Sequence, residues 1–322
     1  MLDSLARDKS GETLSRNTSS NTGREWSKCV ENATTIATWN ILHGASLGSI
    51  STSVSEEIES VNSSAQHLRH IAELMNGVDV LGIVEVDAHQ KRSDFHHQVE
   101  VIAKEMGAHF WYFQPTLVGT PGSSWRKYSE EDSINGGREN GKQVDHTDPQ
   151  PLYGIGLISK IPVAKWHSLS LGRSPVGLPL AFPTSKGTRI IYVKDEPRYA
   201  IAAELENGMT IALTHLSFVP LINISQLLRV KRWLRRLGGD GVLMGDLNLP
   251  WNLPTAKPSA WQSLVRKNSY PSWGGRVQFD YILMHNSVLK KYEVKEVSLD
   301  SSSPTLGQMS DHLPLGVRLV RR

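Results

Sequence analysis

Short apolar runs separated by polar segments dominate the chain, and each run has about the length of a β-strand. Runs that are apolar at nearly every position are typical of strands buried on both faces. Residues 198–218 predict two further strands joined at Asn207-Gly208, a dipeptide typical of a tight hairpin turn. The other predicted strands lie within residues 34–44, 78–87, 109–115, 152–163, 241–250, 277–285 and 312–320.

Three segments have apolar residues at helical spacing instead. The first covers residues 65–75, and the second has Val99 and Ile102 on one side. The third covers residues 224–239 and ends at a glycine pair, which suits a helix C-terminus. The side chains expected to face the core are Leu227, Val230, Leu234 and Leu237. Helices alternating with strands and hairpins predict an α/β layered domain with mixed sheets. The order strand, helix, strand recurs after residue 198, as expected for two packed sheets with helices outside.

The polar segments set the predicted domain limits. Residues 1–33 are rich in Ser, Thr, Asn and charge without apolar periodicity, and they predict a flexible N-terminal tail. Residues 34–322 then form one folded domain. Within it, residues 47–65 have the composition of a loop. Gly, Pro, Asp and Asn dominate residues 119–151, which predict a long loop of the kind that is usually functional or disordered.

Composition narrows the class of protein without selecting a substrate. With 322 residues, of which 39% are hydrophobic and 21% charged, the chain can bury a large core. The net charge of +3 and the pI of about 8.9 permit an anionic substrate but do not indicate one. Cys29 is the single cysteine, which excludes an intramolecular disulfide. Without an apolar leader or a run of about 20 apolar residues, we expect a cytoplasmic protein with no transmembrane segment and no obligate protein partner.

Polar residues interrupt or end several of the apolar strands, where an unpaired buried carboxylate would cost several kcal/mol. Several of these residues lie at the carboxyl ends of the predicted strands, where layered α/β proteins tend to place ligand sites, so one explanation is that the whole set converges. A divalent cation would offset the negative charge, and carboxylate and amide oxygens favour Mg²⁺ or Mn²⁺ over zinc. The residues are Asn40, Glu85, His215, Asp246, Asn248, Asp280, Asp311 and His312.

Spacing separates the expected tasks of two neighbouring pairs. Asp246 and Asn248 are two residues apart, so both would point to the same face of a strand and could hold a water and an oxyanion together. Asp311 and His312 are adjacent, so they would face opposite sides or splay at the mouth of a strand. One of them could then meet a metal while the other meets substrate.

The motifs that carry these residues resemble, in order, the endonuclease/exonuclease/phosphatase superfamily, within it a bacterial branch. The resemblance implies a four-layer α/β sandwich, with two mixed β-sheets flanked by helices, and metal-dependent hydrolysis of phosphoesters in a catalytic domain covering residues 34–322. Many members have Gln before the metal-binding Glu, where this chain has Val84. The matching motifs are TWN (38–40), VEV (84–86), THLS (214–217), GDLN (245–248), FDYIL (279–283) and SDHLP (310–314).

The resemblance also implies a role for each residue. Glu85 corresponds to the main metal ligand, with Asn40 beside it and Asp311 as a further ligand for Mg²⁺ or Mn²⁺. Asp246 corresponds to the residue that orients or deprotonates the attacking water, with help from Asn248. His312 corresponds to the histidine that contacts the scissile phosphate in members of the family, and Asp280 to the carboxylate that orients this histidine. His215 stands where members carry a group near the leaving side. Arg92 and Arg198 are further candidates for contact with the phosphate.

Several functions remain open at this level. A phosphodiesterase of nuclease type is the first candidate, with nucleic acid as substrate and binding that falls steeply with salt. A phospholipid or a small phosphorylated metabolite is the alternative substrate, and a non-catalytic binding module on the same scaffold is the alternative class. The basic run from Arg229 to Arg236 is interpreted as the solvated face of a helix. Four tryptophans lie in Gly/Pro-rich segments, and we expect them to pack their loops against the domain instead of stacking on bases or inserting into a membrane. They are Trp125, Trp251, Trp261 and Trp273.

Overall fold

The computed structural model describes residues 33–45, 57–129, 132, 149–184, 187–299 and 306–322. All described residues belong to one compact unit, residues 33–322. The tail predicted for residues 1–33 therefore lies almost entirely outside the described residues, as does most of the loop predicted for residues 119–151.

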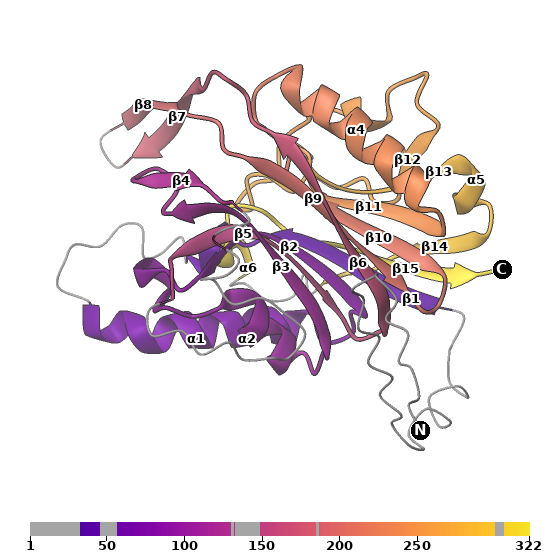
Figure 1. Cartoon of the computed structure of the whole chain (residues 1–322), viewed down its shortest axis with the longest axis horizontal. Coiled ribbons are helices and arrows are strands. Elements are labelled where there is room, and N and C mark those ends of the chain that lie inside the picture. Colours follow the sequence, from indigo (N-terminus) through magenta and orange to yellow (C-terminus); the bar gives the residue numbers. More distant parts are fainter. Residues whose placement is uncertain (1–32, 46–56, 130–131, 133–148, 185–186, 300–305) are drawn as a thin grey trace, which may run out of the picture. The chain divides into compact units, whose positions relative to one another are not determined.

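The first sheet has seven strands in the order β14-β15-β1-β2-β5-β3-β4 (Figure 1). Its central pair, β1 and β2, is parallel, and the remaining neighbours are antiparallel. The strands are β1 (Ala33–Asn40), β2 (Val80–Ala88), β3 (Phe110–Gly119), β4 (Trp125–Lys127), β5 (Leu152–Ser159), β14 (Tyr292–Glu296) and β15 (Leu315–Arg321).

The second sheet has six strands in the order β12-β13-β11-β10-β9-β6, again with one parallel pair, β10 and β11. Its strands are β6 (Val163–Gly172), β9 (Arg198–Leu205), β10 (Met209–Thr214), β11 (Asp240–Asp246), β12 (Trp261–Ser263) and β13 (Asp280–His285). A separate two-stranded sheet consists of β7 (Leu178–Thr184) and β8 (Gly187–Val193).

Helices cover the outer face of each sheet (Figure 1). On the seven-stranded sheet, Leu68 of α1 and Ile102 of α2 pack in one cluster with Trp39. On the six-stranded sheet, Val230 of α4 packs in a cluster with Leu243. The helices are α1 (Glu57–Leu74), α2 (Gln98–Glu105), α4 (Ile222–Leu237), α5 (Asn286–Leu289) and α6 (Leu306–Met309), with short 3₁₀ turns η2 (Leu42–Gly44), η4 (Lys91–Ser93) and η5 (Leu253–Thr255).

A third apolar cluster fills the space between the two sheets. Ile36 and Val84 of the first sheet meet Leu213 and Met244 of the second, all fully buried. The next residue on β1, Ala37, belongs to the cluster under the helices, because successive side chains of a strand point to opposite faces. These clusters make a four-layer α/β sandwich, which confirms the expected fold class.

Each sheet contains one strand, helix, strand crossover, which explains the recurrence seen in the sequence. β1, α1 and β2 form the first, and β10, α4 and β11 form the second. Antiparallel strands begin at the edge where these parallel strands end: Asp280 opens β13 beside Asp246, and Leu315 opens β15 beside Thr38. Asp280 and the residues just before Leu315 therefore reach this edge at the start of antiparallel strands, whereas Asn40 and Asp246 reach it at the ends of parallel strands.

Several predicted element limits differ from the structure. The first helix begins at Glu57, inside the segment predicted as a loop. The strand predicted for residues 152–163 ends at Ser159, where a turn containing Pro162 leads into β6. The last strand begins at Leu315 instead of His312, because Pro314 has no N–H for the ladder. Residues 178–193 form β7 and β8, which the sequence pattern did not predict.

The structure confirms the predicted hairpin turn and corrects the predicted solvated face of the third helix. The Asn207-Gly208 hairpin is confirmed: Gly208 has a φ of 86°, and the Asn207 side chain accepts a hydrogen bond from Met209 N–H at 3.1 Å. Lys231, however, is buried instead of lying on a solvated face. Its ammonium donates to the Pro254 carbonyl and lies 5.6 Å from the Trp261 ring centroid. A lysine stem can be buried in this way when its charged end finds an acceptor.

Candidate active site

Asn40 links the two sheets at the edge where their parallel strands end. Its side-chain amide donates to Glu85 Oε1 at 2.9 Å and to Asp246 Oδ2 at 3.3 Å. Its own Oδ1 accepts from the backbone N–H of Leu42 at 3.1 Å, which fixes the orientation of the amide. Residues from the first strand of one sheet and the last parallel strand of the other are thus brought within one hydrogen-bonded group.

Glu85 sits on a β-bulge of β2. The pairing with β5 shifts register between Val84 and Val86, and Glu85 has a φ of 58°. A bulge redirects a side chain out of the regular alternation, and a positive φ at a residue other than glycine is strained. The bulge accounts for Glu85 standing partly exposed between buried neighbours. Burial raises the pKa of its carboxyl, against the hydrogen bond from Asn40, and nearby Glu196 and Asp246 raise it further.

Asp246 ends β11, and the chain turns immediately after it. Asn248 has a φ of 49° and donates its backbone N–H to Asp246 Oδ1 at 2.8 Å. Its side-chain amide donates to the Leu216 carbonyl at 3.0 Å. The two residues therefore form an Asx-type turn, and the expectation that both point to one face of a strand is wrong. Burial and the charge of Asp280 raise the pKa of Asp246.

His312 and Asp280 form a buried pair. His312 Nδ1 lies 2.6 Å from Asp280 Oδ2, and His312 Nε2 lies 3.8 Å from Asp246 Oδ2. Burial disfavours the charged imidazole, but the charge and hydrogen bond of Asp280, with Asp246 and Asp311, raise the pKa of His312 to about 10. At neutral pH the ring is therefore an imidazolium whose Nε2–H points toward Asp246.

The backbone around His312 is held by three hydrogen bonds. Trp39 Nε1 donates to the His312 carbonyl at 2.8 Å, and His312 N–H is bonded to the Ser310 hydroxyl at 3.2 Å. That hydroxyl in turn donates to the Asn40 carbonyl at 2.7 Å. The ring of Tyr270 packs 4.9 Å from the His312 ring, centroid to centroid. The loop that carries His312 is thereby tied to the end of β1.

Asp311 lies beside this pair and is half-buried. Burial raises the pKa of its carboxyl to about 6; His312 opposes the increase, and Glu85 and Asp280 add to it. His312 bonds Asp280, whereas Asp311 is half-buried beside it, and both lie in a loop before β15 and not in the strand itself. The expectation that the two residues have separate tasks stays a prediction.

His215 follows β10 and lies on the other side of Asp246. Its Nε2 is 3.7 Å from Asp246 Oδ2 and 4.0 Å from Glu85 Oε1. Burial, together with the charges of Arg198 and His312, lowers the pKa of His215 well below its usual value. The two histidines of the site thus differ in protonation: His215 is a neutral imidazole and His312 a cation.

Two arginines flank Glu85. Arg92 donates to both oxygens of Asp87 at 2.8 Å, and its guanidinium lies 5.8 Å from the Tyr153 ring centroid. Arg198 is 5% exposed and forms ion pairs with Asp195 at 3.6 Å and with a second acid at 3.9 Å. Both arginines interact electrostatically with Glu85. The structure therefore brings the two predicted arginines to the border of the acidic cluster.

Sequence reasoning missed several residues that shape the site. Glu196 is the second acid paired with Arg198, and burial raises its pKa. Buried Tyr153 interacts electrostatically with both arginines and with Glu85. Neither residue interrupts an apolar strand in an unusual way, so periodicity gives no signal for them. Tyr270 and Ser310 are also part of the site; only Ser310, which begins SDHLP, had a sequence signal.

The acidic cluster fits a divalent cation by its chemistry. Burial and mutual repulsion raise the pKa of Glu85, Asp246 and Asp311, which a bound cation would reverse. Among the described residues, one ligand atom each of Asp246, Asp280 and His312 lies within 4.8 Å of the others. His312 Nδ1 is already bonded to Asp280 Oδ2, and oxygen ligands suit Mg²⁺ or Mn²⁺, so the carboxylates are the better donors. Asn40 would need its amide turned by half a rotation to present oxygen.

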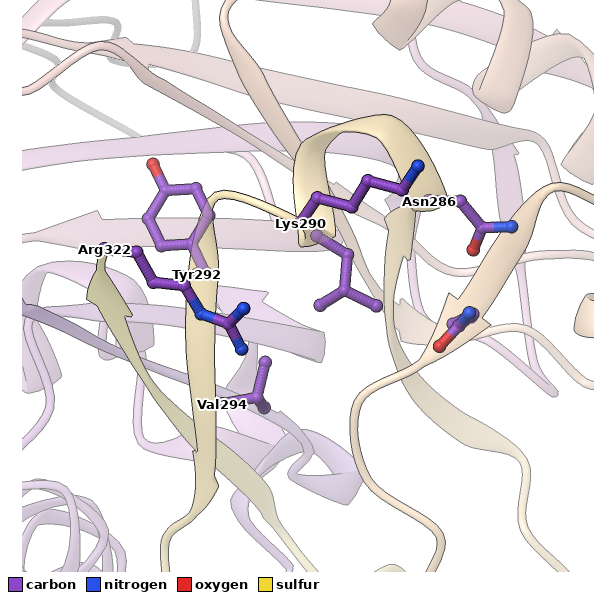
Figure 2. Close-up of a pocket in the computed structure, with 7 residues that line it drawn as sticks. Asn286, Lys290, Tyr292, Val294 and Arg322 are labelled. Carbon is purple, nitrogen blue, oxygen red and sulfur yellow. The ribbon is translucent and has the colours of Figure 1, made fainter.

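A separate cavity of about 540 Å³ lies away from this cluster (Figure 2). It opens beside α5 and β14, and none of the residues discussed above lines it. Asp280 begins β13, and Asn286, which lines the cavity, follows the last residue of that strand. A strand of this length spans about 20 Å, so the cavity lies at the far end of β13 from the candidate active site. The cavity walls are formed by Gln262, Asn286, Leu289, Lys290, Tyr292, Val294 and Arg322.

Comparison with known proteins identifies the family. The sequence matches the model of the Endonuclease/Exonuclease/phosphatase family over residues 37–312, most of the chain. A solved endonuclease/exonuclease/phosphatase family protein from Bacteroides thetaiotaomicron is 13% identical with a TM-score of 0.53, and the match covers 90% of this chain and 98% of that one. The human Nocturnin catalytic domain with bound sulfate anion is 17% identical with a TM-score of 0.51, covering 90% and 94%.

Because all sequence identities to these solved structures are low, the structural similarities establish the fold alone. An endonuclease/exonuclease/phosphatase from Beutenbergia cavernae DSM 12333 is likewise 17% identical, with a TM-score of 0.50 and coverage of 90% of this chain and 72% of that one. No curated protein matches the sequence. In the described part of the chain, every helix is too short or too polar to span a bilayer.

Proposed function

The chain belongs to the endonuclease/exonuclease/phosphatase family, and we propose that it is a divalent-metal-dependent phosphoester hydrolase that acts on phosphodiesters. Members of the family are generally metal-dependent phosphoester hydrolases. The observation that carries the proposal is the convergence of Glu85, Asp246 and Asp311 around the His312–Asp280 pair.

The metal role falls to the acidic side of the cluster. Glu85, Asn40 and Asp311 would hold Mg²⁺ or Mn²⁺, whose bound charge would neutralise the non-bridging oxygens of a phosphate. The raised pKa values of Glu85 and Asp311 support this assignment, because burial disfavours the charged form of each carboxyl and a bound cation would offset that effect. Arg92 and Arg198 border the same space and are proposed to attract the anionic substrate.

Asp246 is proposed to orient the attacking water and to accept its proton. Its carboxylate stands between Asn40, His215 and His312, at 3.3, 3.7 and 3.8 Å. A general base works best when its pKa lies near the working pH, and burial shifts Asp246 in that direction. Asn248 fixes the carboxylate by donating its backbone N–H to Oδ1 at 2.8 Å.

The two histidines are proposed to serve the phosphate and the leaving group. The imidazolium of His312 can donate from Nε2 to a phosphate oxygen, while Asp280 holds Nδ1 and keeps the ring oriented. His215 is neutral and so can donate or accept a single hydrogen bond on the leaving side. This division needs both rings at fixed positions, which the hydrogen bonds to Trp39 and Ser310 provide for His312.

One parallel assay tests the reaction class and the substrate. The purified protein would be incubated with Mg²⁺ or Mn²⁺ and four substrates: bis-p-nitrophenyl phosphate, p-nitrophenyl phosphate, supercoiled DNA and sphingomyelin. EDTA and Asp246→Asn are the controls. We expect turnover of a diester that both controls abolish, and cleavage of DNA would support a nuclease.

The remaining outcomes select among the alternatives. Turnover of p-nitrophenyl phosphate alone would favour a small phosphorylated metabolite as substrate. Turnover that survives both EDTA and Asp246→Asn would refute the metal-dependent mechanism. Absence of both turnover and metal binding by calorimetry would favour a non-catalytic binding module on this scaffold.

A further inference from the structure

Five large apolar side chains are exposed together on α4 and on the loop that follows β11. Trp251 is 78% exposed and Leu221 75%. Ten large hydrophobic residues are exposed in the described part of the chain, and half of them belong to these two segments. We call this set the α4–η5 patch, and it consists of Leu221, Ile224, Leu228, Trp251 and Leu253.

Hydrogen bonds join the two segments into one surface. The Asn223 side chain, at the start of α4, donates to the Asn248 carbonyl at 2.9 Å. Farther along α4, Lys231 donates to the Pro254 carbonyl. The loop of residues 249–254 therefore runs beside the helix. Ile224 and Leu228 are four residues apart, which places them on one stripe of the helix, and Leu221 directly precedes the first residue of the helix.

The two most exposed members of the patch have strained backbones. Leu221 has a φ of 69° and Trp251 a φ of 52°. For residues other than glycine this conformation is strained, and it is found often at functional sites. Neither side chain offsets that strain by burial in the fold, because both are more than half exposed. The sequence interpretation of Trp251 as a residue that packs its loop down is therefore wrong.

The charge on α4 complements an anionic partner. Residues 222–237 contain five cations and no acid, although the whole chain has a net charge of only +3. Arg229 donates to the carbonyls of Leu171 and Ser170, at the end of β6. Within the described residues, no ion pair involves the other exposed arginines of the helix, which are Arg232, Arg235 and Arg236.

We propose that the α4–η5 patch, with the arginines of α4, is a binding surface for an anionic phospholipid membrane. Its apolar end would enter the boundary between head groups and acyl chains, and the arginines would contact the acidic head groups. Arg232 is eight residues from Ile224, or about 12 Å along the helix, so both can reach one interface. Four of the five patch residues are aliphatic and cannot stack on bases, which favours lipid over nucleic acid.

The surface lies next to the candidate active site. Asn248, whose carbonyl holds the start of α4, also bonds Asp246, and Trp251 follows it on the same loop. A membrane bound here would present its phosphodiesters near Asp246. That consequence rests on the proposed function, whereas membrane binding by the patch does not.

Vesicle binding tests the proposal without catalysis. The full chain would be sedimented in EDTA with vesicles of phosphatidylcholine alone or of an equal mixture of phosphatidylcholine and phosphatidylglycerol. We expect binding to the mixed vesicles that weakens as salt is raised. Trp251→Ser should weaken it by about tenfold or more, given the apolar area that a tryptophan buries. Arg232→Glu with Arg236→Glu should weaken it similarly and should remove the preference for anionic vesicles.

Matched controls separate the patch from general stickiness. Phe95→Ser removes an aromatic ring that is 62% exposed between η4 and α2, on the other sheet. Lys104→Glu with Lys165→Glu changes the net charge by the same amount elsewhere. Both controls should bind vesicles like the unchanged protein, and all variants should keep their melting temperatures because the altered residues are exposed.

Each other outcome would overturn the proposal. The first is that the protein binds neither kind of vesicle. The second is that the patch variants and their controls lose vesicle binding equally. The third is that the protein binds DNA and not vesicles, and that Trp251→Ser weakens this DNA binding. Hydrolysis of soluble bis-p-nitrophenyl phosphate is measured separately on the same preparations. Loss of vesicle binding with intact hydrolysis would refute the membrane surface alone, whereas intact vesicle binding without any hydrolysis would refute the proposed enzyme alone.

Discussion

Asp280 and His312 lie 32 residues apart in the sequence, and their side chains meet at 2.6 Å. Asp280 opens β13 in the six-stranded sheet, and His312 precedes β15 of the seven-stranded sheet. The pair therefore joins the two sheets at the candidate active site. Its geometry also fixes the charge of His312, because the carboxylate of Asp280 opposes the effect of burial and keeps the imidazole protonated.

Changing Asp280→Asn should alter the dependence of stability on pH. The pKa of His312 is raised from 6.5 to about 10 in the folded protein, so its pair contributes stability fully below pH 6.5. That contribution is lost as pH rises toward 10. In Asp280→Asn the pKa should fall, so urea unfolding should show a smaller decline in stability over this range. An unchanged pH profile would mean that Asp280 does not set the charge of His312.

His312→Ala should lower turnover by on the order of 10² to 10⁴, the usual range for a positioned proton donor. His215→Ala is the matched variant, because it removes a buried ring on the opposite side of Asp246. Turnover of bis-p-nitrophenyl phosphate under saturating metal measures both. A loss below about tenfold in His312→Ala, with a larger loss in His215→Ala, would transfer the phosphate role to His215.

Glu85→Gln should raise the Mg²⁺ concentration needed for half-maximal activity by about tenfold or more, and should also lower the maximal rate. The amide keeps the shape of the side chain and its contact with Asn40 but removes the charge. A metal titration followed by calorimetry separates binding from catalysis. If the titration midpoint stays where it was, Glu85 leaves the set of proposed ligands.

Asp246→Asn should reduce turnover by on the order of 10² or more while the protein stays folded. The new amide can still accept the Asn248 N–H through its oxygen, so the turn after β11 is kept. Removing a carboxyl whose pKa burial raises also removes a buried charge, which should leave thermal stability unchanged or higher. Turnover close to that of the unchanged protein would exclude Asp246 as the base.

Gly245→Ala tests the close approach that positions Asp246. Gly245 has a φ of +129°, and an added Cβ would lie 1.9 Å from the Thr214 carbonyl oxygen on β10. We expect a loss of at least about 2 to 3 kcal/mol in the free energy of unfolding, measured by urea denaturation. Gly77→Ala is the control, because nothing lies within 4 Å of its added Cβ. Equal stability of both variants would contradict this packing.

The sequence by itself indicated the layered fold and several of the polar residues that the structure brings together. Apolar periodicity is local, so strands buried on both faces and helices with one apolar side could be read from the chain. The Asn207-Gly208 turn likewise carries its own conformational preference. Asn40, Asp246 and His312 stood out because polar residues in or beside buried strands are costly, and this cost alone indicated that they should meet.

Only the tertiary structure decided how those residues are used. The bulge at Glu85, the Asx-type turn at Asn248 and the burial of Lys231 depend on partners distant in sequence. The protonation of the two histidines also depends on such partners, because His215 and His312 are the same residue type and differ only in their surroundings. Asp280 raises the pKa of His312, while burial near Arg198 lowers that of His215, because each pKa is set by the charges that the fold brings close.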